Sequence, residues 1–169
     1  MINIVLYEPE IPGNTGNIMR TCVATNSKLH LIKPLGFSLD DKHMKRSGLD
    51  YIQYLDYKVY ESFEDFKKSN IGTYYYFTRY GKKPHTSFDY SNVDENIYLI
   101  FGKESTGIPK KILINDLDHC MRIPMTNKTR ALNLSNCVAI LTYEVLRQQD
   151  YGDLLRTEPF KGEDYLERD

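Results

Sequence analysis

The chain has 169 residues, of which 41% are hydrophobic and 27% charged, a composition typical of one globular domain. Its formal net charge of −1 argues against a protein that holds nucleic acid through a broad positive field. No apolar run approaches the roughly 20 residues that a bilayer span needs, and the amino-terminal stretch lacks a basic region followed by a signal core.

The first predicted elements are a strand, a helix and a second strand. The apolar run at residues 2–7 (INIVLY) predicts a buried strand, and a Pro- and Gly-containing turn follows it. Residues 14–17 should open a helix, and residues 28–33 form the next strand. Ser38 is a candidate cap for a short basic helix, with Asp41 three residues later.

The middle of the chain continues the alternation of strands and helices. Short strands are predicted at residues 57–60 and 73–78, with a helix between them that is capped by Ser62. Residues 81–84 read as a turn, and residues 96–101 as a further strand.

The carboxyl-terminal part ends in a long amphipathic helix. Pro109 should begin a helix over residues 109–116, and residues 120–123 form the last strand. From residue 134 to 148 the apolar side chains fall at helical spacing, with one face directed inward. The inward positions are Cys137, Val138, Leu141 and Val145.

This order predicts an α/β fold, with a mostly parallel sheet and helices on both faces. We expect one domain over residues 1–150, followed by an acidic tail at residues 151–169. In such sheets ligands bind beyond the carboxyl ends of the strands. The loops at residues 14–20, 102–109 and 125–136 carry the unusual polar residues there.

Charge is unevenly distributed along the chain. The tail holds six acidic and three basic residues, so residues 1–150 carry a net charge of +2. Taken singly, each basic cluster is best read as a solvated surface, and only clusters that share one face would bind phosphates. The clusters are Lys42, Lys45 and Arg46; Lys82 and Lys83; Lys110 and Lys111; Lys128 and Arg130.

Cysteines and histidines give no sign of a metal site. The three cysteines are an odd number without CxxC spacing, which fits a reducing cytoplasm. The four histidines show no metal-ligand spacing. We therefore expect a cytoplasmic protein without a metal ion and without a membrane partner.

Two nucleotide-binding motifs are incomplete in this sequence. Residues 102–107 have the GxxxxG spacing of a P-loop, but Ile108 and Pro109 stand where Lys and Ser or Thr are required. The first strand–helix turn lacks GxGxxG, so a dinucleotide site is unsupported.

Together the three loops resemble the SPOUT superfamily of RNA methyltransferases. NTGNIMR (14–20) is similar to its first motif, LIFGKESTGIP (99–109) to its second and IPMTNKTRALNLSNCVAILTYE (123–144) to its third. The opening NIVLYEPEIP is close to that of compact members that methylate the 2′-oxygen of the cytidine or uridine wobble nucleotide in tRNA. The chain begins at its first strand, so we expect no amino-terminal RNA-binding extension.

The resemblance implies a trefoil-knotted carboxyl-terminal region, S-adenosylmethionine as cofactor, a homodimer and tRNA as substrate. It places the cofactor-binding positions at Phe77, Thr78, Gly102, Ile123, Met125, Ala131 and Leu132. We expect glycine at 102 because backbone approaches a ligand closely only where no Cβ intervenes. Ala131 departs from close relatives, which often have Ser there and could form a side-chain hydrogen bond.

The same resemblance carries over candidate catalytic residues. Arg20 is the first, with Asn14 beside it, and Glu104, Ser135 and Asn136 are further candidates for shaping the site. An arginine does not readily deprotonate in proteins, so Arg20 is expected to fix a phosphate and stabilise the developing alkoxide. The alternative is a surface or helix-pairing arginine.

Dimerisation and substrate are also expectations from the resemblance. The helix over residues 134–148 is an expected interface element through Leu141, Tyr143 and Leu146. Leucine tRNAs are the usual substrates of the wobble-position group. Two alternatives stay open: methylation of another RNA, such as ribosomal RNA, and an RNA-binding protein that kept the fold without catalysis.

Overall fold

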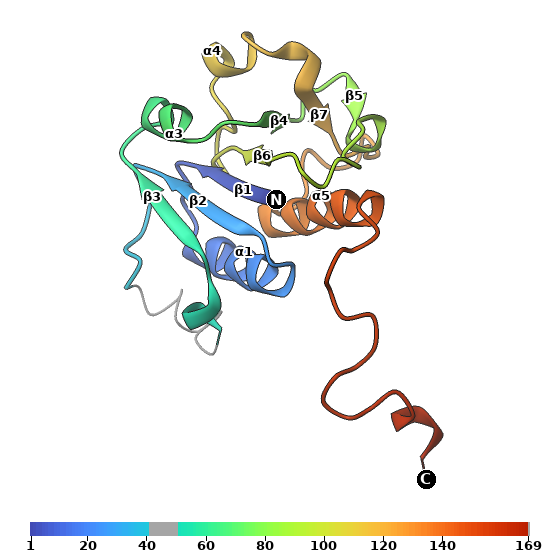
Figure 1. Ribbon diagram of the computed structural model, residues 1–169. Helices are drawn as coiled ribbons and strands as arrows, with labels where there is room; N and C mark the ends of the chain where they lie inside the picture. Colours follow the sequence, from blue (N-terminus) through green and yellow to red (C-terminus); the bar gives the residue numbers. More distant parts are fainter. Residues whose placement is uncertain (41–50, 169) are drawn as a thin grey trace.

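The computed structural model describes residues 1–40 and 51–168, and its centre is a seven-stranded sheet (Figure 1). All strand pairs in the described residues are parallel, and the strand order is β3-β2-β1-β6-β4-β7-β5. The strands are β1 (Ile2–Tyr7), β2 (Lys28–Ile32), β3 (Tyr57–Tyr60), β4 (Thr73–Phe77), β5 (Lys83–Pro84), β6 (Ile97–Phe101) and β7 (Cys120–Arg122). The parallel α/β class predicted from the sequence is confirmed.

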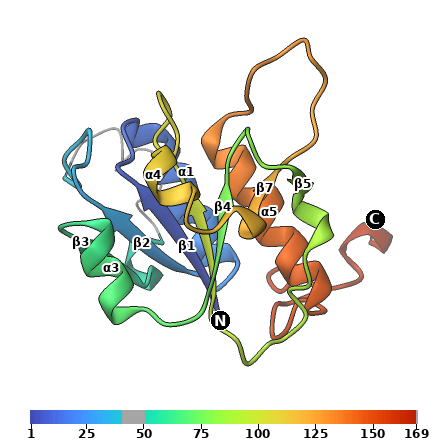
Figure 2. The same ribbon diagram turned by 90° about the horizontal axis from the view of Figure 1, so that it is seen from above.

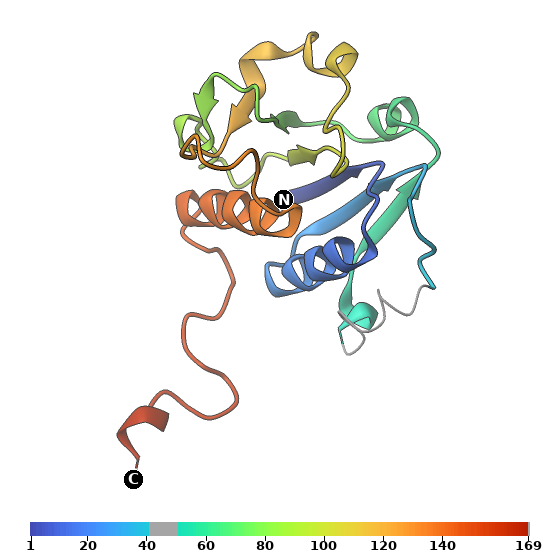
Figure 3. The same ribbon diagram turned by 180° about the vertical axis from the view of Figure 1, so that it is seen from behind.

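Helices cover both faces of the sheet. The α-helices are α1 (Pro12–Ala24), α3 (Phe63–Ser69), α4 (Lys110–Leu113) and α5 (Leu134–Gln148). The 3-10 helices are η1 (Ile52–Tyr54), η2 (His85–Ser87), η3 (Leu117–His119) and η4 (Tyr165–Glu167). Helices α1 and α5 lie against one face, and α3 and α4 against the other (Figure 1, Figure 3).

Two hydrophobic cores result, one on each side of the sheet. Along β1, Ile4 and Leu6 face the core under α1 and α5, whereas Val5 and Tyr7 face the core that contains Phe63 of α3. Every residue of β1 is buried, because successive side chains point to opposite faces and both faces are covered. This explains why every residue of the strand except Asn3 is hydrophobic.

Helix α5 buries the face that the sequence predicts. Cys137, Val138, Leu141 and Val145 are all buried in the core beside α1. Leu141 and Leu146 were expected at a subunit interface, but both are buried within this subunit. Of the three expected interface residues only Tyr143 is exposed, because Leu146 completes the inward stripe of the helix.

Some predicted boundaries are wrong. Residues 81–84 were expected to be a simple turn, but Lys83–Pro84 form β5, which pairs with β7. The helix expected over residues 109–116 is a single turn, Lys110–Leu113, and Asn115 Nδ2 donates to the Lys111 carbonyl at 2.7 Å. An Asn side chain that bonds backbone competes with helix continuation.

Two further differences concern the amino-terminal half. Helix α1 begins at Pro12, two residues before the predicted start, since proline is well suited to the first helical turn. The basic helix expected after Ser38 falls largely within residues 41–50, outside the described residues, as do Lys42, Lys45 and Arg46.

A buried polar network crosses the core beside α3. His30 is only 1% exposed, and its Nδ1 and Nε2 lie 2.9 Å from Tyr60 Oη and 3.0 Å from Asn3 Oδ1. Asn3 Nδ2 donates to the Ile97 carbonyl, so its Oδ1 is the acceptor that receives the His30 Nε2–H. Burial lowers the pKa of His30 to about 4, so the ring is neutral at pH 7 and its Nδ1 accepts from Tyr60 Oη.

The chain beyond α5 leaves the body of the molecule (Figure 1). Leu154 still packs against the core, whereas Phe160 and Leu166 are almost fully exposed. In the described residues no helix is both long and apolar enough to cross a membrane. The division into one domain and an acidic tail stays a prediction.

Candidate functional site

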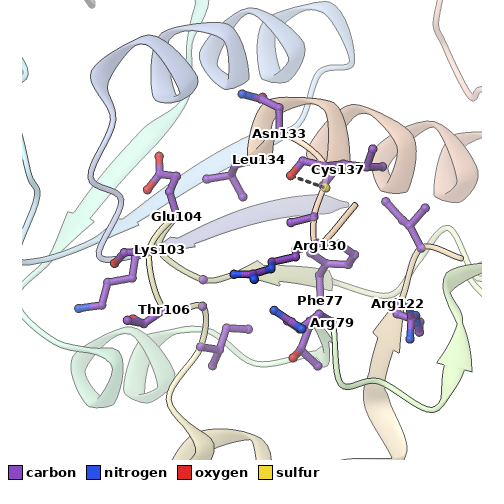
Figure 4. A pocket seen from close by; sticks show the side chains of 18 of the residues that line it. Phe77, Arg79, Lys103, Glu104, Thr106, Arg122, Arg130, Asn133, Leu134 and Cys137 are labelled. Atoms are coloured by element: carbon purple, nitrogen blue, oxygen red, sulfur yellow. Dashed lines mark hydrogen bonds between the residues drawn. The ribbon is translucent and has the colours of Figure 1, made fainter. Parts of the chain in front are cut away.

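A cavity of about 590 Å³ lies at the carboxyl ends of β4, β6 and β7 (Figure 4). Three loops surround it, namely residues 77–80, 102–108 and 122–134, and the first turn of α1 closes one side. Seen from above, the loop between β7 and α5 arches away from the sheet (Figure 2). Parallel strands end at one edge, so loops distant in the chain meet there.

The cavity brings together most of the residues singled out from the sequence. All seven expected cofactor positions line it: Phe77, Thr78, Gly102, Ile123, Met125, Ala131 and Leu132. Of the five expected catalytic residues, Asn14 and Glu104 also line it, whereas Arg20, Ser135 and Asn136 do not. Their roles stay predictions, because placement alone does not show what they bind.

The structure gives a reason for glycine at 102 within its own loop, and the expected close approach of a ligand stays a prediction. A Cβ there would lie 2.1 Å from the Gly107 carbonyl carbon and 2.2 Å from Ile108 N. The loop after β6 folds back on itself, with Gly107 N donating to the Lys103 carbonyl at 2.8 Å. Gly102 therefore permits close packing of its own loop, and Gly107 supplies the positive φ of 73° that closes it.

Glu104 ties this loop to the start of α1. Its Oε2 accepts from Glu10 N at 2.8 Å, and its Oε1 accepts from Ile11 N and Asn14 Nδ2, each at 3.2 Å. The residue before the helix gives no side-chain cap of its own. A carboxylate from a distant segment thus satisfies free N–H groups at the positive end of the helix.

Glu10 in turn binds the loop after β6. Its carboxylate accepts from Ser105 N at 2.9 Å and from Ser105 Oγ at 2.8 Å. These hydrogen bonds, the backbone one first, lower the pKa of Glu10. The carboxylates of Glu104 and Glu10 therefore join the second motif to the turn before α1 and to the first residues of that helix.

Asn133, which precedes α5, links the third motif to the other two. Its Nδ2 donates to Asn14 Oδ1 at 3.0 Å, and its Oδ1 accepts from Ser135 N at 2.9 Å and Ser135 Oγ at 2.6 Å. A chain of hydrogen bonds thus runs Glu104–Asn14–Asn133–Ser135. The sequence showed Asn133 only as a polar residue at a helix start, so its site role was missed.

Cations surround the cavity. Arg79, Arg122 and Arg130 line it, and none of them forms an ion pair with another described residue (Figure 4). Lys103 is instead paired with Glu8 at 2.8 Å. Burial alone would raise the pKa of Glu8, but the hydrogen bonds from Lys103 and Tyr7, together with the lysine charges nearby, lower it on balance. Arg79 and Arg122 were missed because each is a single cation beside a strand end.

One wall of the cavity is apolar and chemically inert. Phe77, Ile108 and Leu134 line it together with Cys137. Burial raises the pKa of the Cys137 thiol to about 11, so the thiol stays protonated at neutral pH and serves as a small hydrophobic group. In the described residues no cluster of three potential metal ligands occurs.

Arg20 lies elsewhere on α1. Its Nε donates to Tyr51 Oη at 2.7 Å, and its guanidinium lies 4.9 Å from the centroid of the Tyr51 ring. It is six residues beyond Asn14, or about 9 Å along the helix axis. Within one subunit Arg20 is therefore not part of the cavity wall.

Comparison with known proteins gives consistent matches. The SpoU rRNA Methylase family matches residues 1–143. A relative from Bacillus subtilis (strain 168) is 53% identical over 154 residues, which are 90% of this chain and 96% of the relative. Its provisional name is tRNA (cytidine(34)-2′-O)-methyltransferase.

Solved structures agree with this fold. A structure that concerns 2-OH methylation of C/U34 on tRNA is 38% identical with a TM-score of 0.83, covering 89% of this chain and 97% of its own. A SpoU methyltransferase from Streptomyces viridochromogenes, in complex with AdoMet, is 20% identical with a TM-score of 0.76. It covers 88% of this chain and 57% of its own, and at this identity it shows the fold alone.

Proposed function

The chain belongs to the SpoU rRNA Methylase family, and from this premise we propose that it methylates the 2′-oxygen of the pyrimidine nucleotide at position 34 of tRNA. Position 34 is the wobble position of the anticodon. The observation that carries the proposal is that the three motifs meet at one cavity, joined by Glu104, Asn14 and Asn133.

S-adenosylmethionine fits this cavity in size and in chemistry. A volume of about 590 Å³ is within the range of small-molecule sites, and one apolar wall faces polar backbone loops. Phe77, Ile123 and Leu132 would contact the apolar parts of the cofactor, and the backbone of residues 102 and 131 its polar groups. When bound, the cofactor supplies a methyl group activated on a sulfonium.

The residues of the chain would position the reacting groups. In-line transfer to a ribose hydroxyl depends mainly on orientation, which the hydrogen-bonded Asn14 and Glu104 would maintain at the cavity edge. The proton of the hydroxyl would leave to water or phosphate. Arg20 would fix a phosphate and stabilise the developing alkoxide rather than act as a base.

Because Arg20 does not line the cavity of its own subunit, a second subunit would have to bring one to it. We propose a homodimer formed by the outward faces of α1 and α5. Ile140 and Tyr143 are exposed on α5, and Ile11 is exposed at the start of α1. Exposed apolar side chains on these segments suit an interface with a second copy.

The finer features follow the same proposal. We expect a trefoil knot in the region of the third motif, a cytoplasmic location and leucine tRNAs as the main substrates. A net charge of only +2 over residues 1–150 suits a small, exposed RNA element such as an anticodon loop.

The test is incubation of the purified protein with methyl-labelled S-adenosylmethionine and total cellular RNA, followed by mapping of the label. Label on the 2′-oxygen of nucleotide 34 of tRNA is the expected result. Label on ribosomal RNA, or on a base instead of the ribose, would contradict the proposed substrate and site of methylation. Retained cofactor binding without any transfer would favour an RNA-binding protein.

A further inference from the structure

We propose that Tyr80 is a stacking platform for a nucleobase of the RNA substrate at the mouth of the methyl-transfer cavity. This rests on the proposed function as an RNA-modifying enzyme. Tyr80 lines the cavity, yet 75% of it is exposed. A single exposed aromatic residue is ordinary on a protein surface, so the inference needs the surroundings of the ring.

The backbone that carries Tyr80 is held in place. Thr78, which is buried, donates its N–H to the Met121 carbonyl at 2.9 Å, and Thr78 Oγ1 accepts from Tyr80 N at 3.3 Å. Gly81 N donates to the Thr78 carbonyl at 3.1 Å, and a Cβ on Gly81 would lie 2.5 Å from the Met121 carbonyl carbon. The turn is therefore packed directly against β7.

This anchoring has a consequence for binding. The backbone of an anchored turn need not be ordered when a partner stacks on the ring, and pre-organisation of this kind increases affinity. In the part of the chain that the structure describes, Tyr80 belongs to neither hydrophobic core and most of its surface is exposed. Packing within the subunit therefore does not explain a tyrosine at this position.

The charges around Tyr80 fit RNA. The guanidinium of Arg79 lies 5.2 Å from the centroid of the ring, and Arg122 and Arg130 line the same cavity. Lys82, which is exposed, follows two residues later. Single-stranded RNA is bound by aromatic rings that stack on splayed bases and by cations that contact the phosphates.

The position of the ring favours a base of the substrate over the cofactor. The apolar wall of the cavity is already supplied by Phe77, Ile108, Leu134 and Cys137, none of which is exposed. A ring that is open to solvent lies where the RNA must approach. A nucleotide held there would be a neighbour of the one that enters the cavity.

The experiment compares Tyr80→Ala, Tyr80→Phe and a control, Tyr165→Ala, in the full-length protein. Tyr165 is half exposed and has Lys161 Nζ 4.5 Å from its ring centroid, but it lies in the tail. Dissociation constants for unmodified tRNA are measured by fluorescence anisotropy. Cofactor affinity is measured by calorimetry, and molar mass by light scattering.

Tyr80→Ala should weaken tRNA binding about 5- to 150-fold, the range expected for loss of one base–aromatic stack. Tyr80→Phe and Tyr165→Ala should stay within about twofold of the wild type, with cofactor affinity and molar mass unchanged in all three. Unchanged tRNA binding by Tyr80→Ala would overturn the proposal. An equal loss of tRNA affinity in Tyr80→Phe would also overturn it, because the hydroxyl rather than the ring would then be responsible. A lower cofactor affinity or a lower molar mass of Tyr80→Ala would overturn it as well.

Failure of the proposed function has a different signature. If the wild type binds tRNA but transfers no methyl group, the assignment as a wobble methyltransferase is wrong, whereas the effect of Tyr80→Ala on tRNA binding still tests the stacking platform.

Discussion

Lowering the pH from 7 to 5 should decrease the free energy of unfolding by about 2 kcal/mol through His30 alone. Burial lowers the pKa of this imidazole from 6.5 to about 4, with Lys28 and Lys58 acting in the same direction and Asp56 opposing them. The unfolded chain takes up a proton as the pH falls through 6.5, but the folded chain does so only near 4.

The structural reason lies in the hydrogen bonds of the ring. Nδ1 accepts from Tyr60, and Nε2 donates to Asn3, so an added proton on Nδ1 would remove the acceptor that Tyr60 uses. The stability that depends on neutral His30 is fully present above pH 6.5. It declines between pH 6.5 and 4, and the whole interval corresponds to about 3 kcal/mol.

Urea unfolding of the wild type and His30→Gln at several pH values between 7.5 and 4.5 measures this effect. The His30→Gln variant can be less stable than the wild type at every pH. Because Gln does not titrate, however, the free energy of unfolding of the variant should fall by about 2 kcal/mol less between pH 7 and 5. Carboxylates titrate in both proteins and cancel in the comparison. Parallel curves for the two proteins would refute the reasoning.

Three other substitutions test the cavity. Gly102→Ala should lower both the melting temperature and the cofactor affinity, because the added methyl group would collide with the backbone of residues 107–108. A loss of cofactor affinity at an unchanged melting temperature would instead indicate that the methyl group collides with the ligand. Glu104→Ala should decrease the free energy of unfolding by about 1–3 kcal/mol in urea, with Glu104→Gln less affected since one acceptor oxygen remains. Arg20→Ala should reduce the rate of methyl transfer by about 10²-fold or more while cofactor affinity, measured by calorimetry, stays near normal. A near-normal rate of methyl transfer by Arg20→Ala would indicate that Arg20 is a surface residue without a catalytic role.

Elements with a strong pattern were predictable from the sequence. Residues 2–7 were recognised as a strand because a central parallel strand is apolar on both faces, and the inward face of α5 followed from its helical spacing. The location of the cavity was predictable too, since loops at the carboxyl ends of parallel strands meet at one edge.

Long-range contacts were not predictable. Asn133 and Asn14 are separated by 119 residues, and nothing in the local pattern of either indicates the other. Strand β5 has only two residues, too few to show an alternating pattern, and it is defined by its pairing with β7. The close packing of Gly107 and Ile108 against residue 102 was not predictable either, because it depends on the whole fold of the loop.

The position of β1 in the sheet also bears on how the protein emerges from the ribosome. Strand β1 pairs with β6, from Ile2 opposite Ile97 to Leu6 opposite Phe101. At about 5–20 residues per second, synthesis of the chain between these strands takes on the order of 5–20 s. During that interval β1 has β2 on one side and an open hydrogen-bonding edge on the other, which is a template for wrong pairing. Protection of nascent chains that have completed β2 but not yet β6 should therefore matter most for the yield of this protein.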